Sequence, residues 1–154
     1  MISVAEALEQ LFALAQPLGI ETVPLLQAHG RVLAQDVAAT RNQPPFDGSA
    51  MDGYAVTEVA PGRRLKVVGE SAAGHGYYQT VKSGEAVRIF TGAPVPEGAK
   101  AVVIQEDVSR DGDWITIGDS PEDNSHIRPA GGDFKIGDTV RAGRVLGSND
   151  IALL

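Results

Sequence analysis

The fold depends on the stretch Pro44-Pro-Phe-Asp-Gly-Ser-Ala-Met-Asp-Gly-Tyr-Ala55. Its prolines fix φ and donate no backbone hydrogen bond, and its two Asp-Gly pairs are typical of turns. The stretch also carries three large apolar side chains, Phe46, Met51 and Tyr54. Such side chains can be buried only if the segment is packed. We therefore expect a rigid surface loop that presents Asp47, Ser49 and Asp52 from a fixed frame, as a metal or phosphate site requires.

The composition of the whole chain favours turns and short strands over long helices. Among its 154 residues are 18 glycines and 9 prolines, while aromatic residues make up 5%. With 43% hydrophobic residues, the chain is long enough for one ordinary core or two small lobes. We expect a mainly β protein with a few short helices, of the β-rich α+β class.

Charge, cysteine content and hydropathy exclude several classes of function. The absence of cysteine rules out disulfides, thiolate metal sites and cysteine nucleophiles. A formal charge of -7 argues against general binding to nucleic acid. No apolar run approaches the roughly 20 residues of a membrane span, and the N-terminus lacks the order of a signal peptide. We expect no membrane partner and a cytoplasmic protein.

An amphipathic helix is predicted at the N-terminus. Ser3 and Glu6 have the spacing of a capping box, and Pro17 and Gly19 stop the helical pattern. Apolar residues recur at helical spacing at Val4, Leu8, Leu11, Phe12 and Ala15. This apolar face needs a partner, which is either the protein's own sheet or a part that is not present in this chain.

The rest of the chain predicts short strands separated by turns. A run at 20–23 ends at Pro24, Leu25 to His29 form one turn closed by Gly30, and Arg31 to Ala39 alternates as a strand does. Five more strands are predicted at 64–69, 77–82, 86–90, 100–106 and 114–117. The segment 119–133 is polar and loop-like. In the tail, two strands flank a turn at Gly143, and Asp150 is the expected N-cap of a helix.

Three polar clusters could carry chemistry: Asp47 with Ser49 and Asp52, the segment 88–98, and the segment 128–133. In the second, Thr91 and Gly92 follow an apolar strand directly. A threonine hydroxyl beside a glycine amide can contact a phosphate or oxyanion, although turn capping is the commoner use of such a pair.

Asp52 and Asp133 are candidate ligands for Mg²⁺, which takes one or two carboxylates together with phosphate oxygens and water. The alternative is that both are ordinary turn residues. Arg88 and Arg128 are candidates to offset ligand charge, or are solvated surface arginines. No nucleophile–base pair, P-loop or zinc site is recognisable, because the histidines are scattered and no glycine-rich run ends in Gly-Lys-Ser/Thr.

Three motifs together resemble the molybdopterin molybdotransferase family, the MoeA type that is related to the E domain of gephyrin. They are Pro-x-Phe-Asp-x-Ser-Ala-Met-Asp-Gly-Tyr-Ala at 44–55, Arg-Ile-Phe-Thr-Gly-Ala-Pro-Val-Pro-Glu-Gly-Ala at 88–99, and Ile-Arg-x-x-Gly-x-Asp at 127–133. The resemblance extends over essentially the whole chain. Within the motifs, Gly48 and His126 stand where Asn is usual, and Gly132 stands where Glu is usual.

The resemblance implies an N-terminal fragment of an enzyme that inserts molybdate into adenylated molybdopterin and releases AMP, with Mg²⁺ assisting. It implies a homodimer whose site is shared between subunits, so that this chain alone is inactive. It also admits the molybdopterin adenylyltransferase as a partner. Its architecture would be an N-terminal helix at 1–19 docking on a missing domain, a linking lobe of coiled strands at 20–43 and 134–154, and an inserted β-rich lobe at 44–133.

The resemblance also implies roles for individual residues. Asp52, Thr91 and Asp133 would be catalytic, with Asp52 and Asp133 also holding the metal. The substrate-binding residues would be Ser49, Gly92, Arg88 and Arg128. Asp47 would order its turn.

Two alternatives belong to other classes of protein. The chain could be a structural or dimerising module without ligand affinity of its own. The tail at 137–146 also resembles strand pairs of lipoyl or biotinyl carrier domains, but no lysine of the chain lies at the tip of a tight hairpin between apolar strands, as a carrier requires.

Overall fold

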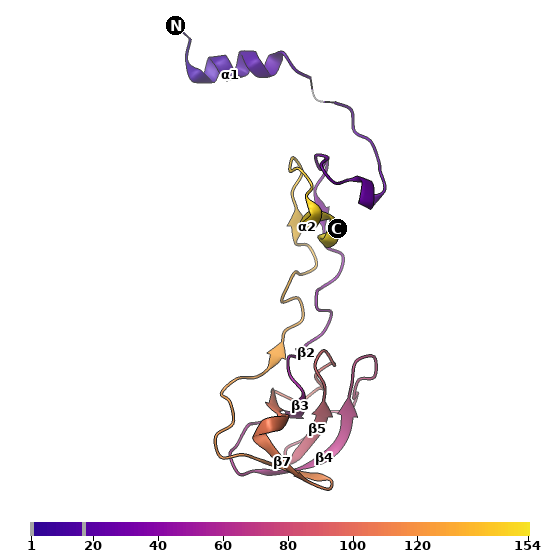
Figure 1. Ribbon diagram of the computed structural model, residues 1–154, viewed down its shortest axis with the longest axis vertical. Coiled ribbons are helices and arrows are strands. Elements are labelled where there is room, and N and C mark those ends of the chain that lie inside the picture. Colours follow the sequence, from indigo (N-terminus) through magenta and orange to yellow (C-terminus); the bar gives the residue numbers. More distant parts are fainter. Residues whose placement is uncertain (1, 17) are drawn as a thin grey trace. The chain divides into compact units, whose positions relative to one another are not determined.

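The computed structural model describes residues 2–16 and 18–154, and its fold is mainly β, which confirms the predicted class. Figure 1 shows the succession of short elements. In chain order they are α1 (Val4–Ala13), η1 (Leu25–Gln27), β1 (Val37–Ala38), β2 (Gly48–Ser49), β3 (Gly53–Val56), β4 (Arg64–Ser71), β5 (Glu85–Ile89), β6 (Ala101–Ile104), η2 (Gln105–Asp107), β7 (Val108–Asp111), β8 (Trp114–Ile117), β9 (Ile127–Arg128), β10 (Thr139–Val140) and α2 (Ser148–Leu153).

Contacts divide the chain into two compact units, Met1–Val37 with Thr139–Leu154, and Ala38–Asp138. The second unit contains a six-stranded sheet with the order β6-β3-β5-β4-β8-β7. All neighbours in this sheet are antiparallel except β4 and β5, which are parallel and shift register between Val67 and Gly69. A separate antiparallel pair, β2 with β9, holds the 127–128 segment against the start of the motif at 44–55.

The core of this unit lies on both faces of the sheet. Along β3, Tyr54 and Val56 pack in one apolar cluster with Leu65, while Ala55 between them packs in another cluster with Val87. Successive side chains of a strand point to opposite faces, so a strand buried on both sides reads as a continuous apolar run. This is the pattern of β3 and β6, in which every residue is buried.

The expected surface loop at 44–55 is wrong at two places, because Gly48–Ser49 is the buried strand β2 and Gly53–Val56 is the buried strand β3. Strand β3 lies between β5 and β6 inside the sheet. Of the three large apolar side chains, Tyr54 is buried, but Phe46 and Met51 are exposed. The chain bends at Met51 and Asp52, and the Asp-Gly pair at 52–53 hides the strand because its glycine is already the first residue of β3.

Three predicted strands, at 64–69, 86–90 and 114–117, are confirmed as β4, β5 and β8. The strand predicted at 100–106 ends at Ile104, where η2 begins. The strand predicted at 77–82 is wrong: no strand forms there, and the segment joins no sheet. The Tyr77 ring instead lies against Gly69, where an added Cβ would come within 2.3 Å of the ring. Strand β7 was not predicted, because three of its four residues are exposed.

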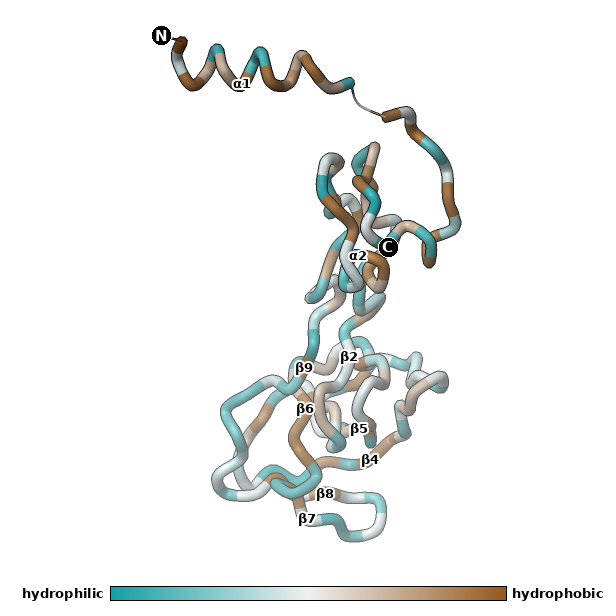
Figure 2. Tube along the Cα trace, turned by 45° about the horizontal axis from the view of Figure 1, so that its top comes forward, coloured by the Kyte–Doolittle hydropathy of each residue, from teal (hydrophilic) through white to brown (hydrophobic). Residues whose placement is uncertain are grey.

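The N-terminal helix is confirmed. Ser3 Oγ accepts a hydrogen bond from the Glu6 N–H, and the Glu6 carboxylate accepts one from the Ser3 N–H, which completes the capping box. The helix ends at Ala13, while the predicted stop at Pro17 lies outside the described residues. No residue of α1 is buried, and the tube in Figure 2 shows hydrophobic and hydrophilic residues recurring along it.

The strand predicted over Arg31 to Ala39 is largely wrong. Val32 forms an isolated bridge with Val145, and β1 pairs with β10. The two tail segments therefore pair with 32–38 and not with one another across Gly143. None of the residues 31–39 is buried. Alternation of residue types predicts a strand only where one of its faces is buried, so here the pattern was misleading.

The C-terminal helix α2 begins after Gly147, so the prediction that Asp150 is its N-cap is wrong. Asp150 is the third helical residue, and its carboxylate accepts a hydrogen bond from the Gly147 N–H at 2.8 Å. The acidic side chain still satisfies an open donor of the first turn, from a different position. None of the helices described, in residues 2–16 and 18–154, has the length and apolar character needed to cross a bilayer.

Candidate functional site

Asp52 and Thr91 meet at the end of the sheet where β3 begins and β5 ends. Asp52 immediately precedes β3 and Thr91 lies just beyond β5, and the register that pairs Gly53 with Ile89 brings these ends together. The Thr91 N–H donates to Asp52 Oδ1 at 2.7 Å, and Thr91 Oγ1 donates to the same oxygen at 2.8 Å. The carboxylate is therefore oriented by two donors from one residue.

These bonds set the electrostatics of the carboxylate. The backbone hydrogen bond from Thr91 lowers the pKa of Asp52 most, followed by the Thr91 hydroxyl, while partial desolvation raises it and the charge of Arg88 lowers it slightly. No donor from the part of the chain that the structure describes reaches Oδ2. Asp52 thus stays ionised and offers one oxygen to a ligand.

Backbone hydrogen bonds join Ser49 to Gly92 and Ala93, and so connect the segment before Asp52 to the segment after Thr91. Ser49 is buried, and its hydroxyl donates to the Met51 carbonyl at 2.6 Å. The Gly92 N–H donates to the Ser49 carbonyl at 2.8 Å, and the Ser49 N–H donates to the Ala93 carbonyl. The Gly92 amide that we expected to contact a substrate oxygen is therefore engaged within the protein in this structure.

Asp47 joins the third motif to the first. Its carboxylate accepts a hydrogen bond from the Ala130 N–H at 2.7 Å, across 83 residues of sequence. In the third motif, Arg128 Nη2 contacts both carboxylate oxygens of Asp133, at 2.5 and 2.6 Å. The motif at 44–55 is thus bonded to both of the others, while the Asp133 carboxylate is already paired with an arginine.

Sequence reasoning missed Gln105, which follows β6. Its N–H donates to the Asp52 carbonyl at 3.0 Å, and its side-chain oxygen accepts a hydrogen bond from Arg88 Nη2 at 2.7 Å. A single glutamine after an apolar strand carries no recognisable signal. The pairing of β3 with β6 brings it to Asp52, and only the fold shows that.

The donors around Asp52 and Asp133 fit a metal differently. Asp52 has an open carboxylate oxygen, whereas both oxygens of Asp133 face Arg128. Within residues 2–16 and 18–154, no group of three or more His, Cys, Asp or Glu side chains gathers as a metal site would require. Of these two carboxylates, Asp52 therefore offers an oxygen to a cation without breaking an ion pair.

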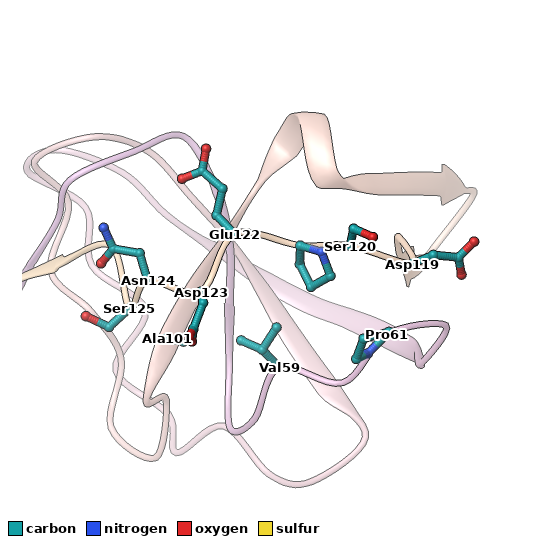
Figure 3. Close-up of a pocket in the computed structure, with 10 residues that line it drawn as sticks. Val59, Pro61, Ala101, Asp119, Ser120, Glu122, Asp123, Asn124 and Ser125 are labelled. Carbon is teal, nitrogen blue, oxygen red and sulfur yellow. The ribbon is translucent and has the colours of Figure 1, made fainter.

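Two cavities of the same unit lie away from these residues. One, of about 490 Å³, is lined by Val59, Pro61, Ala101 and the segment 119–125 (Figure 3). Another, of about 550 Å³, is lined partly by η2 and β7. Neither is lined by a predicted site residue.

The chain belongs to the family described as "MoeA N-terminal region (domain I and II)", which matches residues 2–154. The molybdopterin molybdenumtransferase of Haemophilus influenzae is 42% identical over 127 residues, covering 80% of this chain and 31% of that protein. That of Synechococcus elongatus is 38% identical over 152 residues, covering 92% and 38%. A crystal structure of the MoeA protein from Pyrococcus horikoshii superposes with a TM-score of 0.82 at 38% identity, covering 97% of this chain and 42% of the other. The chain thus spans about a third of the length of these curated relatives.

Proposed function

We propose that this chain is the N-terminal portion of a molybdopterin molybdotransferase, a transferase that inserts molybdate into adenylated molybdopterin and releases AMP. The observation that carries the proposal is the Asp52 carboxylate, with Oδ1 held by two Thr91 donors and Oδ2 open. It lies in the family motif at 44–55, one of the two longer motifs. The names of the relatives, molybdopterin molybdenumtransferase, support the substrate class.

In this proposal Asp52 contacts the metal or the transferring group, and Thr91 orients it. The Thr91 hydroxyl donates to Asp52, and its lone pairs are left to accept from a ligand. Ser49 and Gly92 act on substrate indirectly, because their bonds to one another fix the turns on either side. Arg128 and Asp133 form an ion pair that can open, which would free the arginine for a phosphate and the carboxylate for a metal.

Magnesium is the cofactor that we propose. When bound, Mg²⁺ offsets the charge of phosphate oxygens and thereby favours cleavage of the phosphoanhydride. Asp52 is the carboxylate that best suits it, since its open oxygen needs no rearrangement. Asp133 can serve as a second ligand only after its contact with Arg128 is broken.

The remaining architecture belongs to the same proposal. The segment 44–133 forms the inserted lobe, the segments 20–43 and 134–154 form the linking lobe, and the helix at 1–19 docks on a later domain. The complete enzyme is a cytoplasmic homodimer whose site is shared between subunits, with the molybdopterin adenylyltransferase as its substrate donor. Half of such a site lacks the preorganised shell that catalysis needs, so this chain alone has no turnover.

The test is molybdate-dependent AMP release from adenylated molybdopterin, measured with a polypeptide of the relatives' full length that contains this segment. Asp52→Asn preserves shape but removes the charge, and we expect it to slow release by about a hundredfold or more, the scale of losing one essential electrostatic contact. Asp36→Asn is the matched control, because Asp36 is also a hydrogen-bonded carboxylate but belongs to the other unit. Equal release by the Asp52→Asn variant and the wild type would reduce Asp52 to a turn residue; no release by either would favour a structural or dimerising module.

A further inference from the structure

Arg88 lies beside Asp52 and Gly53 and contacts Tyr54, Phe90, Gln105 and the Gly53 carbonyl. It stands in β5 directly opposite Tyr54 of β3. Its guanidinium carbon is 5.2 Å from the centroid of the Tyr54 ring and 4.6 Å from that of Phe90. Contacts of this length are within the range of cation–π attraction, and they hold the planar group in one orientation.

The same guanidinium fixes the backbone just after Asp52. Arg88 Nη1 donates to the Gly53 carbonyl at 3.0 Å, and Nη2 donates to Gln105 Oε1 at 2.7 Å. Gln105 in turn donates its N–H to the Asp52 carbonyl at 3.0 Å. Two successive carbonyls, of Asp52 and Gly53, are therefore held by two residues that are also bonded to one another.

This closed ring determines the direction in which the Asp52 side chain leaves the backbone. A turn residue whose carbonyl and following peptide are both fixed has little freedom left in ψ. Its carboxylate then meets Thr91 without further ordering. Preorganisation of this kind is what a reacting carboxylate needs from the residues around it.

We propose that Arg88 is a positioning residue of the molybdotransferase site, which acts through the Asp52–Gly53 turn and not by direct contact with substrate. The inference depends on the proposed function only for the identity of the reaction. The contacts of Arg88 from which it is argued do not depend on that function. Lysine cannot replace the residue, because an ammonium lacks the planar fork that serves two acceptors while it stacks on rings.

The first test uses this chain and requires no activity. The Thr91 N–H reports the position of Asp52, since it donates to Oδ1. In Arg88→Met we expect the Thr91 amide proton resonance to move upfield and its hydrogen exchange to become roughly tenfold faster, as loss of one hydrogen bond implies. Arg88→Lys should behave as Arg88→Met does. An unchanged Thr91 resonance in Arg88→Met, or full recovery by Arg88→Lys, would overturn the proposal.

Two further variants keep this test decisive. Arg64→Met is the matched control, because the Arg64 guanidinium also stacks on an aromatic ring of the same sheet, 5.0 Å from the centroid of Trp114. Arg64 pairs with Thr116 of β8 and not with the strands that adjoin Asp52 and Thr91. It should leave the Thr91 amide unchanged. Gln105→Ala removes the side-chain acceptor but keeps the backbone donor, so it should shift the same resonance in the same direction even if Arg88→Met does not fold.

The second test uses AMP release by a full-length polypeptide with Arg88→Met, Asp52→Asn and both changes. If Arg88 acts through Asp52, the double variant is no slower than Asp52→Asn alone. Multiplying losses would show direct contact with substrate and contradict the positioning role. Should the wild type release no AMP, the proposed function fails, while the resonance of Thr91 in the shorter chain still decides whether Arg88 positions the turn.

Discussion

At the scale of single residues, Thr91 lowers the pKa of Asp52 through two hydrogen bonds, one from its backbone N–H and one from its hydroxyl. A substitution can remove the second bond alone. Thr91→Val deletes the hydroxyl donor but keeps the backbone N–H, which is the larger cause of the lowered pKa. We therefore expect the pKa of Asp52 to rise only part of the way toward its ordinary value of about 3.9. Carboxyl resonances followed by NMR through an acid titration of this chain measure the change directly.

The same substitution changes how stability depends on pH. Because the folded pKa of Asp52 is depressed, its contribution to stability is fully present above about pH 4, the unfolded pKa, and is lost as the pH falls through the folded pKa. In Thr91→Val the acid-dependent part of this contribution becomes smaller. Asp36, whose pKa is lowered by the Ala142 N–H and by Arg141, is the internal reference. A shift of Asp36 together with Asp52 would indicate general unfolding instead.

Two departures from the family motifs are explained by local backbone geometry. His126 has φ 49, in the left-handed region where Asn is favoured and His is also enriched, so a histidine can replace the usual asparagine. Its carbonyl accepts a hydrogen bond from the Ala50 N–H at 2.8 Å. A Cβ added at Gly48 would meet only the Ala93 carbonyl oxygen, at 3.9 Å, so the backbone there accommodates the first atom of a side chain.

At the scale of elements, strand β3 leaves no room for a side chain at its first position. A Cβ at Gly53 would lie 2.0 Å from the Val103 carbonyl oxygen in the backbone of β6. Gly53→Ala must therefore move one strand of the buried sheet, and we expect it to lower the free energy of unfolding by about 1–3 kcal/mol. Chemical denaturation measures the loss.

The matched control for this prediction is Gly48→Ala in β2. The new methyl group would lie 3.9 Å from the Ala93 carbonyl oxygen, which is an ordinary van der Waals contact. Because alanine also lowers the conformational entropy of the unfolded chain, the free energy of unfolding should stay unchanged or rise by about 0.4–1 kcal/mol. Equal midpoints for the two variants would mean that β3 and β6 are less closely packed than the distance indicates.

Much of the sheet could be predicted from sequence, but its centre could not. The strands at 64–69, 86–90 and 114–117 are bounded by Gly, Pro and Asp turns, so local patterns identify them. Strand β3 is four residues long and buried on both faces, so it has no alternation to detect, and its first residue belongs to an Asp-Gly pair that is typical of turns. The pairing of β1 with β10 joins segments a hundred residues apart, which no local pattern encodes.

The sequence identified which residues belong to the candidate site better than it identified what each residue does there. Asp52 and Thr91 were singled out from motifs, and the structure bonds them together. The contacts that Gly92 and Arg88 make with the protein itself depend on the register of β3 with β5 and on turns that the register sets. Residue types therefore indicated the chemistry, while tertiary pairing determined which donors remain available to a ligand.

At the scale of the whole molecule, α1 presents an apolar face that this chain does not bury. Leu11 is 60% exposed and Phe12 is 68% exposed. Under the proposed function, a later segment of a polypeptide of the relatives' length covers this face. Covering a leucine or phenylalanine side chain contributes about 1.5–3 kcal/mol.

Leu11→Ser and Phe12→Ser, introduced separately, test that expectation in two contexts. In this chain both side chains are already in water, so the midpoint of denaturation should not change. In a polypeptide of the relatives' full length each variant should lower the free energy of unfolding by about 1.5–3 kcal/mol, the contribution of a buried apolar side chain. Glu9→Ser, at an exposed polar position of the same helix, is the control for helix propensity. If the longer polypeptide tolerates both apolar changes as well as it tolerates Glu9→Ser, the face of α1 is not docked within that polypeptide, and the proposed role of the segment 1–19 is wrong.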